Sequence, residues 1–119
     1  MAFAGLTGAT LPTRRISDDT SDFDNDGKSD IVLQNTNGQA AIWLMNGATP
    51  ITPMTPVGAN PGSSWHVIGS GDFYGNGYSD ILWQNISTGE VYILDINGTN
   101  AIGGGSPGNP GTSWHAIGE

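Results

Sequence analysis

The amino-acid sequence predicts an all-β protein, and three observations support this fold class. The 119 residues include 19 Gly and 7 Pro but only three Lys and Arg together. Gly and Pro, which interrupt helices, thus far outnumber Lys and Arg, which favour them. Asn-Gly pairs at 37–38, 46–47, 76–77 and 97–98 are typical of the tight turns between antiparallel strands. The third observation is an internal repeat of about fifty residues, a period that indicates a propeller or a solenoid. We expect no helix of three turns.

The composition limits the size and the partners of the protein. The chain is long enough for one hydrophobic core and roughly too short for two. Eleven Asp and Glu against three Lys and Arg give a net charge of −8, which argues against a nucleic-acid partner. No stretch approaches the roughly 20 apolar residues of a membrane span. The chain has no Cys, and residues 1–15 lack the pattern of a signal peptide.

The repeat is carried by three pairs of matching segments, of which the longest is identical at eight of fourteen positions. The pairs are 22–35 with 72–85, 40–47 with 91–98, and 61–69 with 110–118. Their offsets of fifty, fifty-one and forty-nine residues differ only through turns. We therefore divide the chain into an N-terminal extension (1–15), a first repeat (16–64), a second repeat (65–112) and a last strand (113–119).

The strands expected within the repeats are short. In the second repeat, 65–69, 81–84 and 91–96 are apolar runs separated by Gly-containing turns. In the first, residues 40–45 are apolar on both alternating faces, as in a strand covered on both sides. Residues 49–62 carry four Pro and are expected to form an edge strand and a connecting loop.

An acidic loop is the strongest chemical signal. Asp22, Asp24, Asp26 and Asp30 occupy positions one, three, five and nine of a turn that Gly27 permits. Carboxylates spaced in this way can converge on Ca²⁺, and the carbonyl of Lys28 would add a ligand. An EF-hand would need Glu at position twelve, where Leu33 stands within a predicted strand. The alternative is a solvated acidic turn without an ion.

The second copy of the loop keeps fewer ligands. Asp72, Asn76 and Asp80 remain, but Tyr74 replaces the second acid, which lowers the negative charge. We expect weaker calcium binding there, with the Tyr78 carbonyl as a further ligand, or a turn held by hydrogen bonds alone.

These motifs resemble the FG-GAP/VCBS class of repeat, which also occurs in integrin α-subunit heads and in bacterial propeller lectins. The resemblance covers residues 16–119. It implies β-propeller blades of four antiparallel strands, with calcium in the loop that joins the first strand to the second. Because calcium is abundant outside cells and similar proteins are commonly exported, it also implies an extracellular or cell-surface location.

Two Trp-His pairs are candidate ligand-binding residues. Trp65-His66 and Trp114-His115 each follow a Ser and stand at matching positions of the repeat. Either the Trp rings pack between blades, or they stack on a sugar while His donates hydrogen bonds. Trp43 and Trp83 lie within apolar runs and are expected in the core.

Two functions are compatible with these features. One is a non-enzymatic, calcium-binding structural or adhesive module; the other is a carbohydrate-binding lectin with sugar sites between blades. Apart from the loop ligands, the acids form no pattern of paired catalytic carboxylates, so we expect no enzyme activity.

Two repeats are fewer than the four to eight blades of a closed propeller. The Ser-Trp-His motif is absent before the first acidic loop, where Arg15 and Ile16 stand, but recurs at 113–115. We therefore expect a homo-oligomeric ring, with a trimer favoured and a tetramer as the alternative. The rival interpretation is a fragment of a longer propeller.

Overall fold

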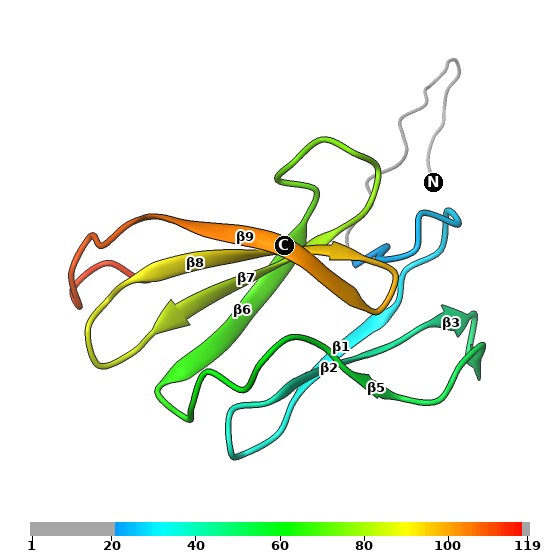
Figure 1. Cartoon of the computed structure of the whole chain (residues 1–119), viewed down its shortest axis with the longest axis horizontal. Helices are drawn as coiled ribbons and strands as arrows, with labels where there is room; N and C mark the ends of the chain where they lie inside the picture. Colours follow the sequence, from blue (N-terminus) through cyan, green and yellow to red (C-terminus); the bar gives the residue numbers. More distant parts are fainter. Residues whose placement is uncertain (1–20, 118–119) are drawn as a thin grey trace, which may run out of the picture.

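The computed structural model describes residues 21–117, which form antiparallel strands and turns and no helix (Figure 1). The predicted all-β class is confirmed for this part of the chain. The N-terminal extension (1–15), the start of the first repeat (16–20) and the end of the last strand (118–119) lie outside the described residues.

The second repeat forms one four-stranded antiparallel sheet. Its strands follow one another in chain order: β6 (Trp65–Gly71), β7 (Asp80–Asn85), β8 (Val91–Asn97) and β9 (Asn100–Gly108). The first three match the predicted apolar runs. Strand β9 was not predicted, because its Asn-Ala-Ile-Gly-Gly-Gly-Ser-Pro-Gly sequence has little strand propensity. It is exposed along its whole length and pairs with β8 as an edge strand.

The first repeat is divided between two smaller sheets. Strands β1 (Ile31–Gln34), β2 (Ala40–Trp43) and β5 (Thr55–Pro56) form one sheet in the order β1-β2-β5. Strands β3 (Met45–Asn46) and β4 (Thr49–Pro50) form a hairpin around Gly47. The strand predicted over 40–45 is therefore interrupted at Leu44. Proline lacks a backbone N–H and cannot continue a ladder, which keeps β4 and β5 to two residues each.

One core joins the two repeats. Phe23, Ile42 and Val57 of the first repeat pack in the same buried cluster as Ile81 and Ile96 of the second. Backbone hydrogen bonds also cross between them: Ser79 N donates to Asp22 O at 2.9 Å, and Gly98 N donates to Phe23 O at 2.7 Å. The acidic loop of the first repeat is thus anchored on the second.

A glutamine side chain at the end of β1 connects the repeats. Gln34 Nε2 donates to Trp65 O at 2.5 Å, and Gln34 Oε1 accepts from Val67 N at 3.0 Å. The amide of Gln34 therefore holds the start of β6 as a neighbouring strand would.

The same arrangement recurs at the end of the second repeat. Gln84 Nε2 donates to Trp114 O at 2.8 Å, and Gln84 Oε1 accepts from Ala116 N at 2.8 Å. Residues 114–116 thus lie against the second repeat as the start of β6 lies against the first. Within the described chain, however, this segment belongs to no sheet.

Candidate metal centre

The loop from Asp22 to Asp30 is held by hydrogen bonds to its two end carboxylates. Asp22 is buried and accepts from Asp26 N at 3.2 Å and from Gly27 N at 3.0 Å. Asp30 is also buried and accepts from Phe23 N at 3.0 Å and from Met45 N of β3 at 2.9 Å. These bonds close the loop and connect it to β3.

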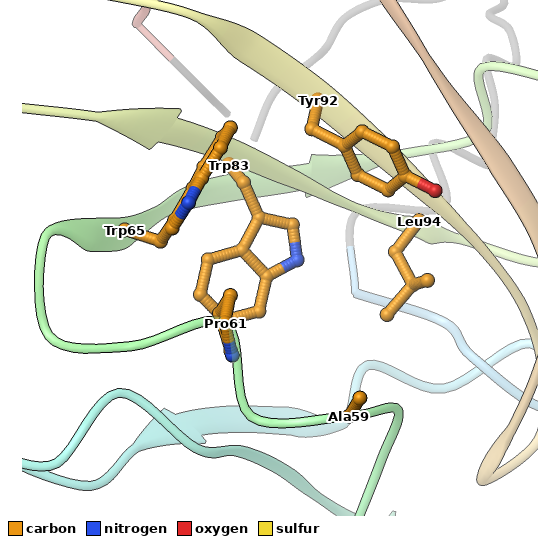
Figure 2. Close-up of a pocket in the computed structure, with 6 residues that line it drawn as sticks. All are labelled: Ala59, Pro61, Trp65, Trp83, Tyr92 and Leu94. Carbon is orange, nitrogen blue, oxygen red and sulfur yellow. The ribbon is translucent and has the colours of Figure 1, made fainter. Parts of the chain in front are cut away.

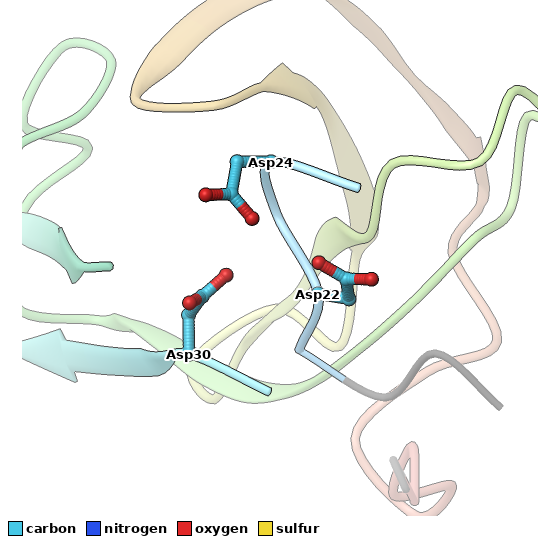
Figure 3. Close-up of side chains that lie close together, drawn as sticks. All are labelled: Asp22, Asp24 and Asp30. Atoms are coloured by element: carbon cyan, nitrogen blue, oxygen red, sulfur yellow. The ribbon is translucent and has the colours of Figure 1, made fainter. Parts of the chain in front are cut away.

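Three of the four predicted carboxylates come together in this loop. Oxygens of Asp22, Asp24 and Asp30 lie within 4.8 Å of one another. In Figure 3 the carboxylates of Asp24 and Asp30 point into the same space, with Asp22 beside them. It is the one cluster of three potential metal-ligating side chains found among residues 21–117.

Asp24 differs from the other two members of the cluster. Its Oδ1 is buried and accepts no hydrogen bond. Burial, followed by the charges of Asp30 and Asp26, raises the pKa of Asp24 to about 6. Burial also raises the pKa of Asp30. An unsatisfied carboxylate oxygen among like charges is stabilised by a bound cation, and carboxylates are the hard ligands that calcium prefers. These residues therefore fit a calcium ion.

The fourth predicted carboxylate lies outside the cluster. Asp26 is exposed, and its Oδ1 accepts from Lys28 N at 2.9 Å in a local turn. Coordination by Asp26 and by the Lys28 carbonyl remains a prediction.

The second loop repeats the frame without the cluster. Asp72 accepts from Asn76 N at 3.1 Å and from Gly77 N at 2.9 Å. Asp80 accepts from Phe73 N at 3.1 Å and from Ile96 N at 2.9 Å. These bonds match those of Asp22 and Asp30, so the turn is closed in the same way. Asn76 Oδ1 accepts from Tyr78 N at 3.1 Å, as Asp26 does from Lys28.

An acid that the sequence did not single out lies beside the second loop. Asp95 comes from β8, at the position that Leu44 occupies in the first repeat. Its Oδ1 is buried without a hydrogen-bond partner. Burial, with the side chain of Asp95 as a further cause, raises the pKa of Asp80 to about 6. Asp95 escaped notice because it lies in a strand, outside the D-x-D-x-D-G frame.

The two Trp-His pairs have different surroundings. Trp65 lines a cavity of about 330 Å³ at the junction of the repeats, between a loop of the first repeat and the sheet of the second (Figure 2). Its ring meets that of Tyr92 edge-on, with centroids 6.5 Å apart. The cavity is lined by Ala59, Pro61, Trp65, Trp83, Tyr92 and Leu94.

The second pair lines a smaller space of about 100 Å³ near Gln84. Trp114 is 71% exposed and His115 is exposed, as is His66. Trp83 is buried in the core, as predicted, whereas Trp43 is only half-buried.

Comparison with known families identifies the repeat to which these motifs belong. The family model for the FG-GAP-like repeat matches residues 22–83, which include the acidic loop and both sides of the repeat junction. No curated protein and no solved structure matches the chain. Among the described residues, no helix is long and apolar enough to cross a membrane. Since the matched segment spans more than half of its length, the chain belongs to the FG-GAP-like repeat family.

Proposed function

We propose that this chain is a non-enzymatic, calcium-binding β-propeller module that acts as a structural or adhesive binding scaffold. Each repeat contributes one four-stranded blade, and further copies complete the ring. The observation that carries the proposal is the buried, unpaired Oδ1 of Asp24 among three converging carboxylates. Family membership supports it independently.

Asp22, Asp24 and Asp30 would hold the ion, with Asp26 and the Lys28 carbonyl as further candidate ligands. Calcium would supply the positive charge that allows these acids to be ionised together. Asp22 and Asp30 already accept backbone hydrogen bonds from the loop and from β3. An ion bound to them would therefore stabilise the loop and its attachment to the sheet. We propose that the second loop binds calcium more weakly than the first. Its ligands would be Asp72, Asn76, Asp80 and the Tyr78 carbonyl.

The proposal places the protein outside the cell or at its surface, where calcium reaches millimolar concentrations. It assigns the acids of both loops to structural roles and not to catalysis. Support comes from the backbone hydrogen bonds that Asp22, Asp30, Asp72 and Asp80 accept.

Calcium dependence of stability tests the proposal. Calcium bound by the folded loop raises the melting temperature by mass action, because the unfolded chain has no such site. At pH 7, we expect calcium to raise the melting temperature of the native chain and of Asn76→Ala. We expect Asp24→Ala to lose most of this increase, and Asp26→Ala to lose it as well if Asp26 is a ligand. Identical melting curves of the native chain in calcium and in excess chelator would contradict calcium binding.

A lectin is the second candidate, favoured by the aromatic cavity at the repeat junction. A pyranose ring can place its C–H groups against the face of Trp65, and the cavity of about 330 Å³ has the size of a small-ligand site. A sugar-agarose series tests this function. We expect retention of the native chain and its loss in Trp65→Ala, provided that the variant keeps its far-ultraviolet circular dichroism. Failure of the native chain to bind any sugar would leave Trp65 with a packing role.

A further inference from the structure

We propose that the cavity at the junction of the repeats binds a flat, uncharged aromatic ligand of one or two rings, whose oxygen acceptor takes a hydrogen bond from the indole N–H of Trp83. The inference goes beyond the proposed calcium module and is independent of its acidic loops. It names a different class of ligand from the sugar of the second candidate function. The two classes compete for the same cavity, and one titration separates them.

The first observation is a buried donor without an acceptor. Trp83 is 4% exposed and belongs to the core cluster, yet its Nε1 makes no hydrogen bond with residues 21–117. In Figure 2 this nitrogen lies on the side of the indole that faces Leu94, another side chain of the cavity lining. Buried indole N–H groups usually have a partner, because an unpaired one loses the hydrogen bond that it makes to water. A ligand in the cavity would supply the missing acceptor.

The second observation is the space beside this donor, which measures about 330 Å³. An apolar cavity of about 150 Å³ is enough for benzene. The present one therefore has room for one ring with a substituent or for two fused rings. Water in this space would leave the apolar walls in contact with solvent. A flat ring that replaces the water buries these walls.

The walls are held in place by hydrogen bonds outside the cavity. The Trp65 carbonyl accepts from Gln34 Nε2, and Trp65 N donates to Gly62 O at 3.2 Å. In the loop of the first repeat, Asn60 Oδ1 accepts from Gly62 N at 2.9 Å. These bonds fix the backbone on both sides of the space. Small-ligand sites are largely pre-formed in this way.

The side chains of the lining determine the class of ligand. They are apolar or aromatic, and their polar atoms are the two indole N–H groups and the phenol of Tyr92. A pyranose carries several hydroxyl groups that each need a partner when buried, whereas an aromatic ring carries none. The indole N–H presents the positive end of its dipole, which favours an oxygen acceptor over a cation. The net charge of −8 disfavours an anion.

Nuclear magnetic resonance of the ¹⁵N-labelled chain tests the inference, because each of the four Trp gives its own indole N–H signal. Trp83→Phe identifies the Trp83 signal by its loss. We expect acetophenone, one ring with a carbonyl acceptor, to shift this signal downfield. α-Methylstyrene has the same shape with CH₂ in place of the oxygen, so ring-current effects are alike. It should bind roughly 2–10-fold more weakly, which corresponds to the loss of one neutral hydrogen bond, and give no such shift.

Three variants separate the cavity from general effects on the fold. Ala59→Phe, at an exposed position of the lining, should fill the cavity and abolish the acetophenone shift without changing the core. Trp83→Phe should bind both probes equally, provided that it keeps its far-ultraviolet circular dichroism. Trp43→Phe, which lies outside the lining, is the matched control and should bind both probes as the native chain does.

Equal binding of the two probes by the native chain, or no response of the Trp83 signal to either, would overturn the inference. Methyl α-glucopyranoside is the sugar probe. A shift of the Trp83 signal by this sugar but not by acetophenone would also overturn the inference, and would support the lectin. The calcium dependence of the melting temperature is measured separately, so the calcium proposal and this inference can fail independently.

Discussion

At the scale of single residues, the acids of the first loop have separate roles. Asp22 and Asp30 accept backbone hydrogen bonds from Gly27 and Met45, and their counterparts Asp72 and Asp80 keep equivalent bonds in the second loop. These aspartates are thus explained by the turn itself. Asp24 Oδ1 does not hold the turn in this way, because it is buried without a hydrogen-bond partner. It is therefore the residue that distinguishes a metal centre from a closed turn.

The raised pKa of Asp24 predicts a pH dependence in calcium-free buffer. The folded-state pKa is about 6, above the ordinary value of 3.8. The contribution of protonated Asp24 to stability is therefore full below about pH 4 and is lost as the pH rises through about 6. Asp24→Asn, which stays neutral, should match the native chain at pH 4 and melt at a higher temperature at pH 7.

Thermal melts of both proteins at pH 4, 5, 6 and 7, after removal of calcium, measure this difference. Adding calcium at pH 7 should reverse the order, because Asn lacks the charge that a cation site uses. A native chain that is as stable as Asp24→Asn at every pH would show that Asp24 is not destabilised in the folded protein.

At the scale of elements, a turn of each repeat approaches the last segment of the same repeat so closely that only glycine fits. Gly38 has φ of +106° and lies against the Gly62 carbonyl, and Gly89, at φ +90°, lies against Gly111 in the same way. The close approach brings Gln34 and Gln84 within hydrogen-bonding distance of the next segment. The hydrogen bonds from Gln34 to Trp65 and from Gln84 to Trp114 therefore depend on two turn residues.

A pair of glycine substitutions separates this contact from simple backbone strain. Gly38→Ala should destabilise the protein by roughly 2–5 kcal/mol, because the strained φ and the clash with Gly62 O add together. Gly47→Ala, at φ +62° with nothing within 4 Å of the added Cβ, should cost about 1 kcal/mol. Chemical denaturation measures both free energies of unfolding; equal losses would show that the approach of Gly38 to Gly62 is unimportant.

At the scale of the whole molecule, the two repeats share one core but differ in the strands that the structure describes. The sheet of the second repeat has four strands, whereas among residues 21–117 the main sheet of the first repeat consists of β1, β2 and β5 (Figure 1). Residues 114–117 present Trp114 and Ile117 to solvent beyond the second repeat. The shared core of Phe23, Ile42 and Ile81 packs the two repeats against each other.

Much of this protein could be predicted from the sequence, because its signals are local. Gly, Pro and Asn-Gly turns indicated short antiparallel strands, and the comparison of residues 22–35 with 72–85 revealed the repeat. The acidic loop was recognisable because its four aspartates lie within nine residues. Three of its four carboxylates do converge. Strand β9 was missed, because its pairing with β8 overrides the weak strand propensity of its glycines.

Only the tertiary structure decided which side chains meet across the repeats. Gln34 is an unremarkable polar residue in sequence, yet its amide reaches Trp65 and Val67, more than thirty positions away. Asp95 likewise approaches Asp80 because β8 runs beside β7. The Trp65 cavity forms where a loop of one repeat crosses the sheet of the other. Contacts of this kind depend on packing between distant segments, which local propensity and spacing do not encode.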